Sequence, residues 1–156
     1  MKTYEYNGET YEYNDEQEFI PFFGKPNLNN RIYTEEEIDK IVKQFNKKAK
    51  ELPVFGQIEF PENCEMSLSK VSHRIHKIKK EKGKVIGTIT ILNTDQGKLL
   101  LHMLKYGVFR PRMSGTIDNN GIVTVDKIFS FDFILKENDS YNEEKLILKE
   151  QQTKTE

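Results

Sequence analysis

The stretch from residue 85 to residue 107 constrains the fold of this chain more than any other part of its sequence. Residues 85–92 are β-branched or apolar with Gly and Thr between them, which is the composition of a strand buried on both faces. Thr94 then predicts a helix N-cap, because its hydroxyl can accept a backbone N–H that the first turn leaves unbonded. Apolar residues follow at helical spacing as far as Gly107, where a left-handed residue is expected to end the helix. A strand, a turn and a helix are therefore predicted in this order.

The N-terminal residues predict a β-hairpin. Asn7-Gly8 lies between two stretches of alternating tyrosines and suits a type I′ turn, because both residues tolerate positive φ. The resulting register places Tyr4 opposite Tyr11 as an aromatic cross-strand pair. Residues 1–23 carry six acidic residues and one Lys. We therefore expect an acidic hairpin arm.

Two further antiparallel pairs are predicted along the chain. Residues 71–78 and 85–92 have the pattern of strands and are joined through residues 79–83. Asp118-Asn-Asn-Gly121 is a hairpin signal that follows a strand at residues 108–116. The second pair is completed by the apolar residues beyond this turn.

The strands after Gly121 contain an acidic residue that cannot be left unpaired. Residues 122–125 and 128–135 are apolar enough to be strands, and three phenylalanines alternate there with Ser130 and Asp132. This alternation predicts one apolar and one polar face. Because a bare buried carboxylate is too costly, Asp132 must be hydrogen-bonded or lie in a cleft.

A helix is predicted between Thr34 and Pro53. Thr34 and Glu37 have the spacing of a capping box, in which each side chain bonds the other's backbone N–H. The residues after them define one apolar helix face: Ile38, Ile41, Val42, Phe45, Ala49 and Leu52. Pro53 ends the helix, and a strand is expected from there to Pro61.

These elements predict an α+β fold of mostly antiparallel strands with two main helices. A length of 156 residues is enough for one well-buried core. We expect an acidic hairpin arm at residues 1–24, a main domain at 25–135 and a polar tail at 136–156. The tail carries one weak helix signal at 146–148.

Composition narrows the classes of function. The net charge of −1 provides no overall attraction to nucleic acid or to an anionic membrane. The single cysteine, Cys64, excludes an internal disulfide and fits a reducing compartment. The sequence contains neither a membrane-spanning apolar run nor a secretory signal. A cytoplasmic protein with no membrane partner is therefore expected.

The histidines do not predict a metal site. His73 and His76 lie three residues apart on a predicted strand and so face opposite sides, and His102 lies far along the chain. Adding Cys64 still leaves too few ligands. No glycine-rich phosphate loop is present either, so no metal and no cofactor are expected.

One basic segment suggests an alternative function. Residues 70–84 contain seven Lys or Arg and one Glu, at the tip of a predicted hairpin. The segment lacks the interleaved aromatic residues that stack on bases, and lysines at an exposed strand edge commonly prevent aggregation. A basic-hairpin nucleic-acid-binding module is therefore kept as an alternative, and a nucleic-acid partner is not the expectation.

Several short motifs together resemble one protein family. They occur in a consistent order and cover residues 25–135: Asn27-x-Asn29-x-Arg31-x-Tyr33, Gly56-Gln-Ile-Glu-Phe60-Pro61, Val71-Ser-His73, the strand–helix junction at 85–98, Arg110-Pro-Arg112-Met-Ser-Gly115 and Asp132. This order and spacing resemble the prohead core proteases of tailed phages, serine peptidases that mature the capsid interior. The resemblance implies a compact β-barrel with flanking helices, akin to the herpesvirus assemblins. It also implies phage capsid or scaffold proteins as partners.

The chain departs from this family at the two positions that carry the chemistry. Phe60 stands where the family has its catalytic His, and Arg110 stands where it has the nucleophilic Ser. A serine nucleophile needs a base within hydrogen-bond reach, and neither Phe nor Arg can take these roles. Ser114 with His73 as base, and Asp132 as the late-strand acid, are the fallback candidates. If the resemblance holds, Phe60 and Arg110 should lie in contact at the ends of adjacent strands, with Arg110 stacked on Phe60 or paired with Asp132.

Three hypotheses follow from the sequence. The first is a non-catalytic phage capsid-assembly protein on the prohead protease fold, present in the host cytoplasm during assembly and also considered for the virion head. The second is an active prohead maturation endopeptidase that cleaves scaffold or capsid proteins, and the third is the nucleic-acid-binding module. The sequence leaves open whether the chain forms a homo-oligomer.

Overall fold

The computed structural model describes residues 1–61, 66–136 and 144–148 of this chain. Within these ranges the fold is α+β and mostly antiparallel, with two α-helices, as predicted. The strands and helices follow in this order: β1 (Lys2–Tyr6), β2 (Glu9–Tyr13), β3 (Glu16–Ile20), α1 (Glu35–Glu51), β4 (Val54–Gln57), β5 (Val71–Glu81), β6 (Lys84–Ile91), α2 (Asp95–Met103), β7 (Gly107–Ile117), β8 (Val123–Leu135) and β9 (Lys145–Leu148). Short 3₁₀ helices span Leu68–Lys70 and Leu104–Tyr106.

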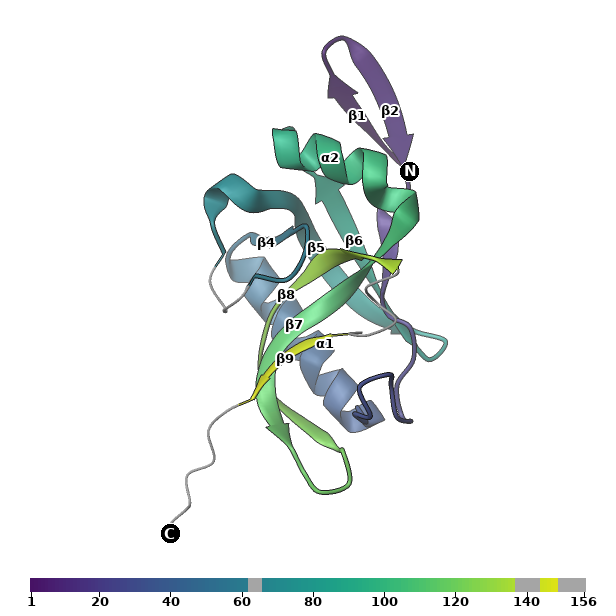
Figure 1. Cartoon of the computed structure of the whole chain (residues 1–156), viewed down its shortest axis with the longest axis vertical. Helices are drawn as coiled ribbons and strands as arrows, with labels where there is room; N and C mark the ends of the chain where they lie inside the picture. Colours follow the sequence, from purple (N-terminus) through teal and green to yellow (C-terminus); the bar gives the residue numbers. More distant parts are fainter. Residues whose placement is uncertain (62–65, 137–143, 149–156) are drawn as a thin grey trace.

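The strands form three sheets with the orders β1-β2, β3-β6-β5-β4 and β8-β7-β9. The two larger sheets are joined at one side by a parallel bridge between Ile58, just after β4, and Phe133 of β8. On the other side β3 meets β7 through packed aromatic rings: Phe19 lies 5.6 Å from Phe109 and 4.4 Å from Phe131, centroid to centroid. The expected antiparallel β-barrel or sheet with flanking helices is confirmed in part: within the described residues the strands form three sheets and no closed barrel (Figure 1), because side-chain packing takes the place of a ladder between β3 and β7.

The predicted strand–turn–helix is present as β6 and α2. The Thr94 hydroxyl accepts the backbone N–H of Gly97 at 3.0 Å, which caps the helix as expected. The role predicted for Gly107 is wrong, because its backbone is extended (φ −147°, ψ −171°) and begins β7. A Cβ on Gly107 would lie 2.3 Å from the Ile134 carbonyl oxygen, so glycine is needed here for close strand approach.

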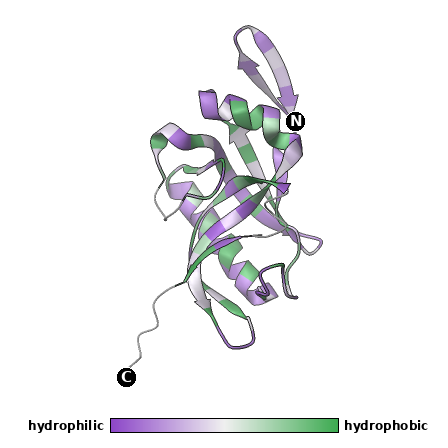
Figure 2. Cartoon of the chain, viewed as in Figure 1, coloured by the Kyte–Doolittle hydropathy of each residue, from purple (hydrophilic) through white to green (hydrophobic). Residues whose placement is uncertain are grey.

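Helix α1 has the predicted N-cap but only half of the predicted capping box. Thr34 accepts the N–H of Glu37 at 3.2 Å, whereas the Glu37 carboxylate accepts the N–H of Val125 at 2.7 Å. The capping glutamate thus ties the helix to β8. Ile38, Ile41 and Phe45 are buried as predicted; Leu52 is 71% exposed, because it follows the last helical residue and lies off the buried face. Figure 2 shows hydrophobic and hydrophilic residues alternating along this helix.

The N-terminal hairpin has the predicted turn and register. Asn7 and Gly8 have φ of 51° and 80°, and Tyr4 pairs with Tyr11. The hairpin projects past α2 in Figure 1. The basic hairpin is longer than predicted, since β5 and β6 extend to a two-residue turn at Lys82-Gly83 with positive φ. Such turns match the twist of paired strands.

The region after Asp118 differs from the prediction in two respects. Residues 123–135 form one continuous strand rather than two, and bulges in its pairing with β7 take up the irregular pattern. Both faces of this strand are buried, because Ser130 and Asp132 are enclosed as fully as Phe131 and Phe133. The expected polar face is therefore an internal polar layer.

The segment predicted to be a polar tail contains a strand. Residues 145–148 form β9, parallel to residues 112–115 of β7, so the weak helix signal at 146–148 is wrong. Leu146 is buried while Leu148, on the same face, is 56% exposed, and a strand of four residues is too short to detect from periodicity in the sequence. The division of the chain into arm, domain and tail stays a prediction. Cys64 and the rest of the predicted tail lie outside the described residues.

Within the described ranges, no helix is both long and apolar enough to span a membrane.

Replacing Gly107 tests why a glycine stands there. Gly107→Ala is expected to lower the free energy of unfolding by about 1–3 kcal/mol, because the new Cβ would overlap a backbone carbonyl of β8. Gly107→Asn should cost at least as much. The control is Gly83→Asn, at φ +79° with no atom within 4 Å of a Cβ, which should cost much less. Urea denaturation measures all three; a Gly107→Asn variant more stable than Gly107→Ala would contradict the close-approach explanation.

Candidate functional site

The three positions singled out by the family resemblance lie on neighbouring strands. The chain after β4 runs along one edge of β8, where the Glu59 N–H donates to the Phe133 carbonyl at 2.6 Å, and Phe60 follows. β7 runs along the other edge of β8, and Arg110 is the Cα partner of Asp132. The expectation that Phe60 and Arg110 end adjacent strands is wrong, because β8 with Asp132 lies between them.

Arg110, which the resemblance aligns with the family's nucleophilic Ser, is buried. Its side chain is 4% exposed, and one guanidinium nitrogen donates to the carbonyls of Phe109 at 2.8 Å and Glu18 at 3.4 Å. These bonds direct the guanidinium towards β3. Phe60, by contrast, is half-buried where the chain leaves β4. A stack between the two side chains stays a prediction.

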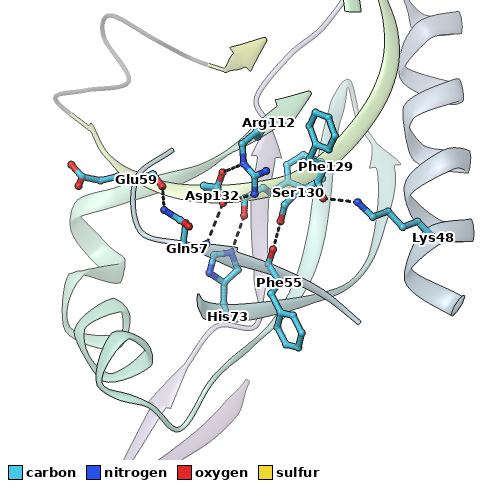
Figure 3. A network of polar contacts seen from close by, with 10 residues as sticks. Lys48, Phe55, Gln57, Glu59, His73, Arg112, Phe129, Ser130 and Asp132 are labelled. Carbon is cyan, nitrogen blue, oxygen red and sulfur yellow. Dashed lines mark hydrogen bonds and ion pairs between the residues drawn. The ribbon is translucent and has the colours of Figure 1, made fainter. Parts of the chain in front are cut away.

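The partner of Asp132 is Arg112 rather than Arg110 (Figure 3). Arg112 Nε donates to Asp132 Oδ2 at 2.7 Å, and its Nη2 lies 3.5 Å from Oδ1. The backbone N–H of Gln57 donates to the same Oδ1 at 3.1 Å. Burial raises the pKa of Asp132, while the arginine and this N–H oppose the rise. Asp132 is thus hydrogen-bonded, as its place in an apolar strand requires.

Sequence reasoning missed Arg112 as that partner, although a signal was present. The residue lies two positions after Arg110 on the same strand and occupies the arginine position of the family motif. Two residues apart on a strand share a face. Arg110 is directed towards β3, and Arg112 is the arginine that bonds Asp132.

His73 is a buried structural histidine. Its Nε2–H donates to the Phe131 carbonyl at 2.8 Å, which leaves Nδ1 to accept the Ser72 hydroxyl at 2.9 Å. The ring lies over Gly56, where an added Cβ would be 2.2 Å from Nε2. Burial lowers the pKa of His73 to about 4, against the smaller effect of the carbonyl. The imidazole is therefore neutral and has both nitrogens occupied.

The fallback pair of Ser114 and His73 is not brought together. Ser114 pairs with Lys127 of β8 and Ile147 of β9. His73 bonds to Phe131, whose partner on β7 is Pro111, three residues before Ser114. At about 3.3 Å per strand residue this is a separation of roughly 10 Å. No direct proton transfer between these side chains is possible at such a distance.

Lys48 of α1, an exposed residue, reaches the border of the internal polar layer, and this contact was not predicted (Figure 3). Its ammonium donates to the carbonyls of Phe129 at 2.9 Å and Ile128 at 3.3 Å. Desolvation and the nearby Arg112 lower the pKa of Lys48. Its position three residues after buried Phe45, at the border of the apolar face, was the available signal.

A second polar cluster surrounds Glu144, and we call it the carboxylate cradle: Asn27, Asn29, Arg31 and Tyr33. Glu144 is 2% exposed, and each of the four residues donates one hydrogen bond to its carboxylate. In the sequence, residues 27–33 were identified only as a family motif, and Glu144 was placed in the polar tail. Four side-chain donors within seven residues were the signal that a shared acceptor had to exist.

The cradle adjoins the position of the family's nucleophile. Arg110, Pro111, Tyr33 and Glu144 all line one small pocket of about 20 Å³. That volume holds about one water molecule. The pocket is therefore too small to admit a peptide substrate beside Arg110.

Metal and nucleic-acid sites find no support in the described residues. In the ranges 1–61, 66–136 and 144–148, no three His, Cys, Asp or Glu residues gather in a way that could hold a metal ion. The basic hairpin is paired with acids: Lys80 bonds Glu35 and Asp39 at 2.7 Å each, and Lys84 bonds Glu18 at 2.9 Å.

Comparisons with known proteins support the fold. No family model matches the sequence, and no curated protein matches it. Among solved structures, the chain is similar to the capsid assembly protease gp21 of bacteriophage T4, with a TM-score of 0.62 and 19% identity over 76% of this chain and 79% of that chain. At this identity the similarity shows the fold alone. The chain therefore has a phage prohead protease-like fold.

The buried imidazole of His73 is expected to make stability fall in mild acid. Between about pH 6.5 and pH 4 the unfolded chain binds a proton on this ring and the folded chain does not. The free energy of unfolding therefore decreases as the pH is lowered through this range, by roughly 3 kcal/mol over the whole range. His73→Gln should be less stable at pH 7 but lose less on acidification. Urea denaturation at several pH values measures this, with the exposed His102→Gln as control. Equal slopes in wild type and His73→Gln would contradict the assignment.

The Asp132–Arg112 pair is expected to behave as a coupled unit. Asp132→Asn or Arg112→Met alone should each lower the free energy of unfolding by about 3–5 kcal/mol, because the remaining buried group loses its partner. Asp132→Asn combined with Arg112→Met should cost less than the sum of the single changes. A double-mutant cycle by chemical denaturation measures the coupling, and additive losses would show that the pair does not act together. Lys84→Ala, in an exposed pair, is the control and should cost about 1 kcal/mol or less.

Proposed function

We propose that this chain is a phage capsid-assembly protein on the prohead protease fold and that it does not act as a peptidase. The observation that carries the proposal is the occupancy of the pocket. Arg110 is buried where the resembling family has its nucleophilic Ser, and Phe60 stands where the family has its His, on either side of Asp132.

The chemistry of the remaining groups supports an inactive site. Acyl transfer needs a nucleophile beside a base that can take its proton. Ser114 has no histidine in reach, and both nitrogens of His73 are engaged. Ser72 does contact His73, but it is fully buried, so no substrate carbonyl can approach its hydroxyl.

The proposed partners are phage capsid or scaffold proteins. The protease of similar fold is, by its name, a capsid assembly protein, and we extend that setting to this chain. We propose the host cytoplasm during assembly as the place of action, with the virion head as a further location. The projecting β1–β2 hairpin is one surface available for such contacts (Figure 1).

The absence of peptidase chemistry is testable with a serine-directed fluorophosphonate. Purified protein is expected to remain unlabelled and to leave scaffold and capsid peptides intact, because no serine is activated by a base. Labelling is measured by intact mass. Labelling that Ser114→Ala abolishes would establish the active-protease hypothesis in place of this one; Ser69→Ala, an exposed serine, is the control.

The assembly role is testable by association with immature capsids of a phage that encodes this chain. The protein is expected to co-sediment with the particles. Deletion of its gene is expected to cause a defect in head formation. A matched chain with Lys79→Glu and Lys82→Glu tests the nucleic-acid alternative, because removing basic charge should leave co-sedimentation unchanged. Normal heads without the protein would contradict the proposed role.

A further inference from the structure

The carboxylate cradle provides hydrogen-bond donors for both carboxylate oxygens of a glutamate. Asn27 and Asn29 each donate to Glu144 Oε2 at 2.9 Å, while Arg31 and Tyr33 donate to Oε1 at 2.8 and 3.2 Å. Each carboxylate oxygen thus has two donors, one of them charged at Oε1. A buried carboxylate is tolerated only with such a set of partners.

The cradle residues are held in place by bonds that do not involve Glu144. The Asn27 Oδ1 accepts the N–H groups of Asn29 and Arg31 at 2.9 and 3.0 Å, and Gly24 donates to the Tyr33 carbonyl. Ile32 exchanges backbone bonds with Gly121 and Val123 at the β7–β8 turn. The donors are therefore pre-organised for a carboxylate, which lowers the entropic cost of binding one.

The residues after Glu144 are held as an added strand. β9 pairs in parallel with residues 112–115 of β7, and Leu146 is the buried side chain, two residues after the glutamate. Lys145 is only half-buried and Leu148 is exposed. One carboxylate, a short backbone ladder and one apolar side chain are the elements by which sheet edges bind extended peptides.

We infer that the cradle and the β7 edge at residues 112–115 form a binding site for an extended peptide with Glu followed two residues later by Leu or Ile. The chain fills the site with its own residues 144–148, and the occupant in trans is a segment of a partner protein with the same pattern. This inference rests on the geometry of the cradle and does not depend on the proposed function.

Competition from the chain's own residues 144–148 sets the affinity that a partner segment needs in order to bind. A ligand carried by the same chain meets its site at an effective concentration, which for a short linker is on the order of millimolar. A partner segment in solution therefore binds the wild-type chain weakly, whereas high local concentration in an assembly, or a longer complementary strand, allows exchange. The site is selective for glutamate because Arg31, Asn27 and Asn29 would lose bonds to a neutral side chain.

The test is peptide binding to a full-length chain whose own segment is disabled. Glu144→Ala with Leu146→Asp vacates the site, and a fluorescent acetyl-Glu-Lys-Leu-Ile-Leu-amide peptide is titrated by anisotropy. It is expected to bind this variant at least tenfold more tightly than wild type. A peptide with Gln in place of Glu, or the additional change Arg31→Ala, should weaken binding at least tenfold; Lys105→Ala is the control. A folded variant that does not bind the peptide, or binds the Gln peptide equally well, would overturn the inference.

Hydrogen exchange on the wild-type chain decides the matter if the variant does not fold. The amides bonded between β9 and β7 are expected to exchange at least 100-fold faster than those between β7 and β8, through local release of residues 144–148. Equal protection of the two ladders would make β9 part of the cooperative core and overturn the inference. Neither measurement involves peptidase activity or capsids, so both are independent of the proposed function.

Discussion

The buried pair of Asp132 and Arg112 is the interaction on which the arrangement of the two larger sheets depends. Asp132 on β8 bonds Arg112 on β7 and the backbone of Gln57 at the end of β4, so one carboxylate ties three strands together. This point lies beside the bridge that joins the sheets. Because removing one partner of a buried pair leaves the other charge without solvent, a change at Asp132 or Arg112 alone is expected to disturb all three strands.

The sequence predicted those turns and helix caps that depend only on residues a few positions apart. Asn7-Gly8, Thr94 and Thr34 act within one turn, and the structure places each as predicted. Glu37, Gly107 and Glu144 were misassigned because their partners lie far along the chain: Val125, Ile134 and the residues at 27–33. No periodicity within a window of ten residues contains that information.

For the candidate site, the sequence likewise predicted which positions are involved but not which distant residues they contact. The family motifs led to residues that matter, since Asn27, His73, Arg112 and Asp132 all take part in buried or partly buried polar contacts. Their roles differ from those expected of catalysis. His73 needs Gly56 beneath its ring, so two motifs that look unrelated in the sequence are one packing unit. A motif match identified positions, whereas burial and hydrogen bonds determine what each position does.

Two arginines and two carboxylates explain why the proposed inactive site is stable. Arg112 neutralises Asp132 and Arg31 neutralises Glu144, while Arg110 lies near the pocket between them and bonds to carbonyls of β3 and β7. Asp132 Oδ1 accepts the N–H of Gln57 and Oδ2 accepts Nε of Arg112, so both oxygens take part in bonds that join β4, β7 and β8. In this structure Asp132 and Glu144 therefore both serve the fold, each through an arginine and further hydrogen-bond donors.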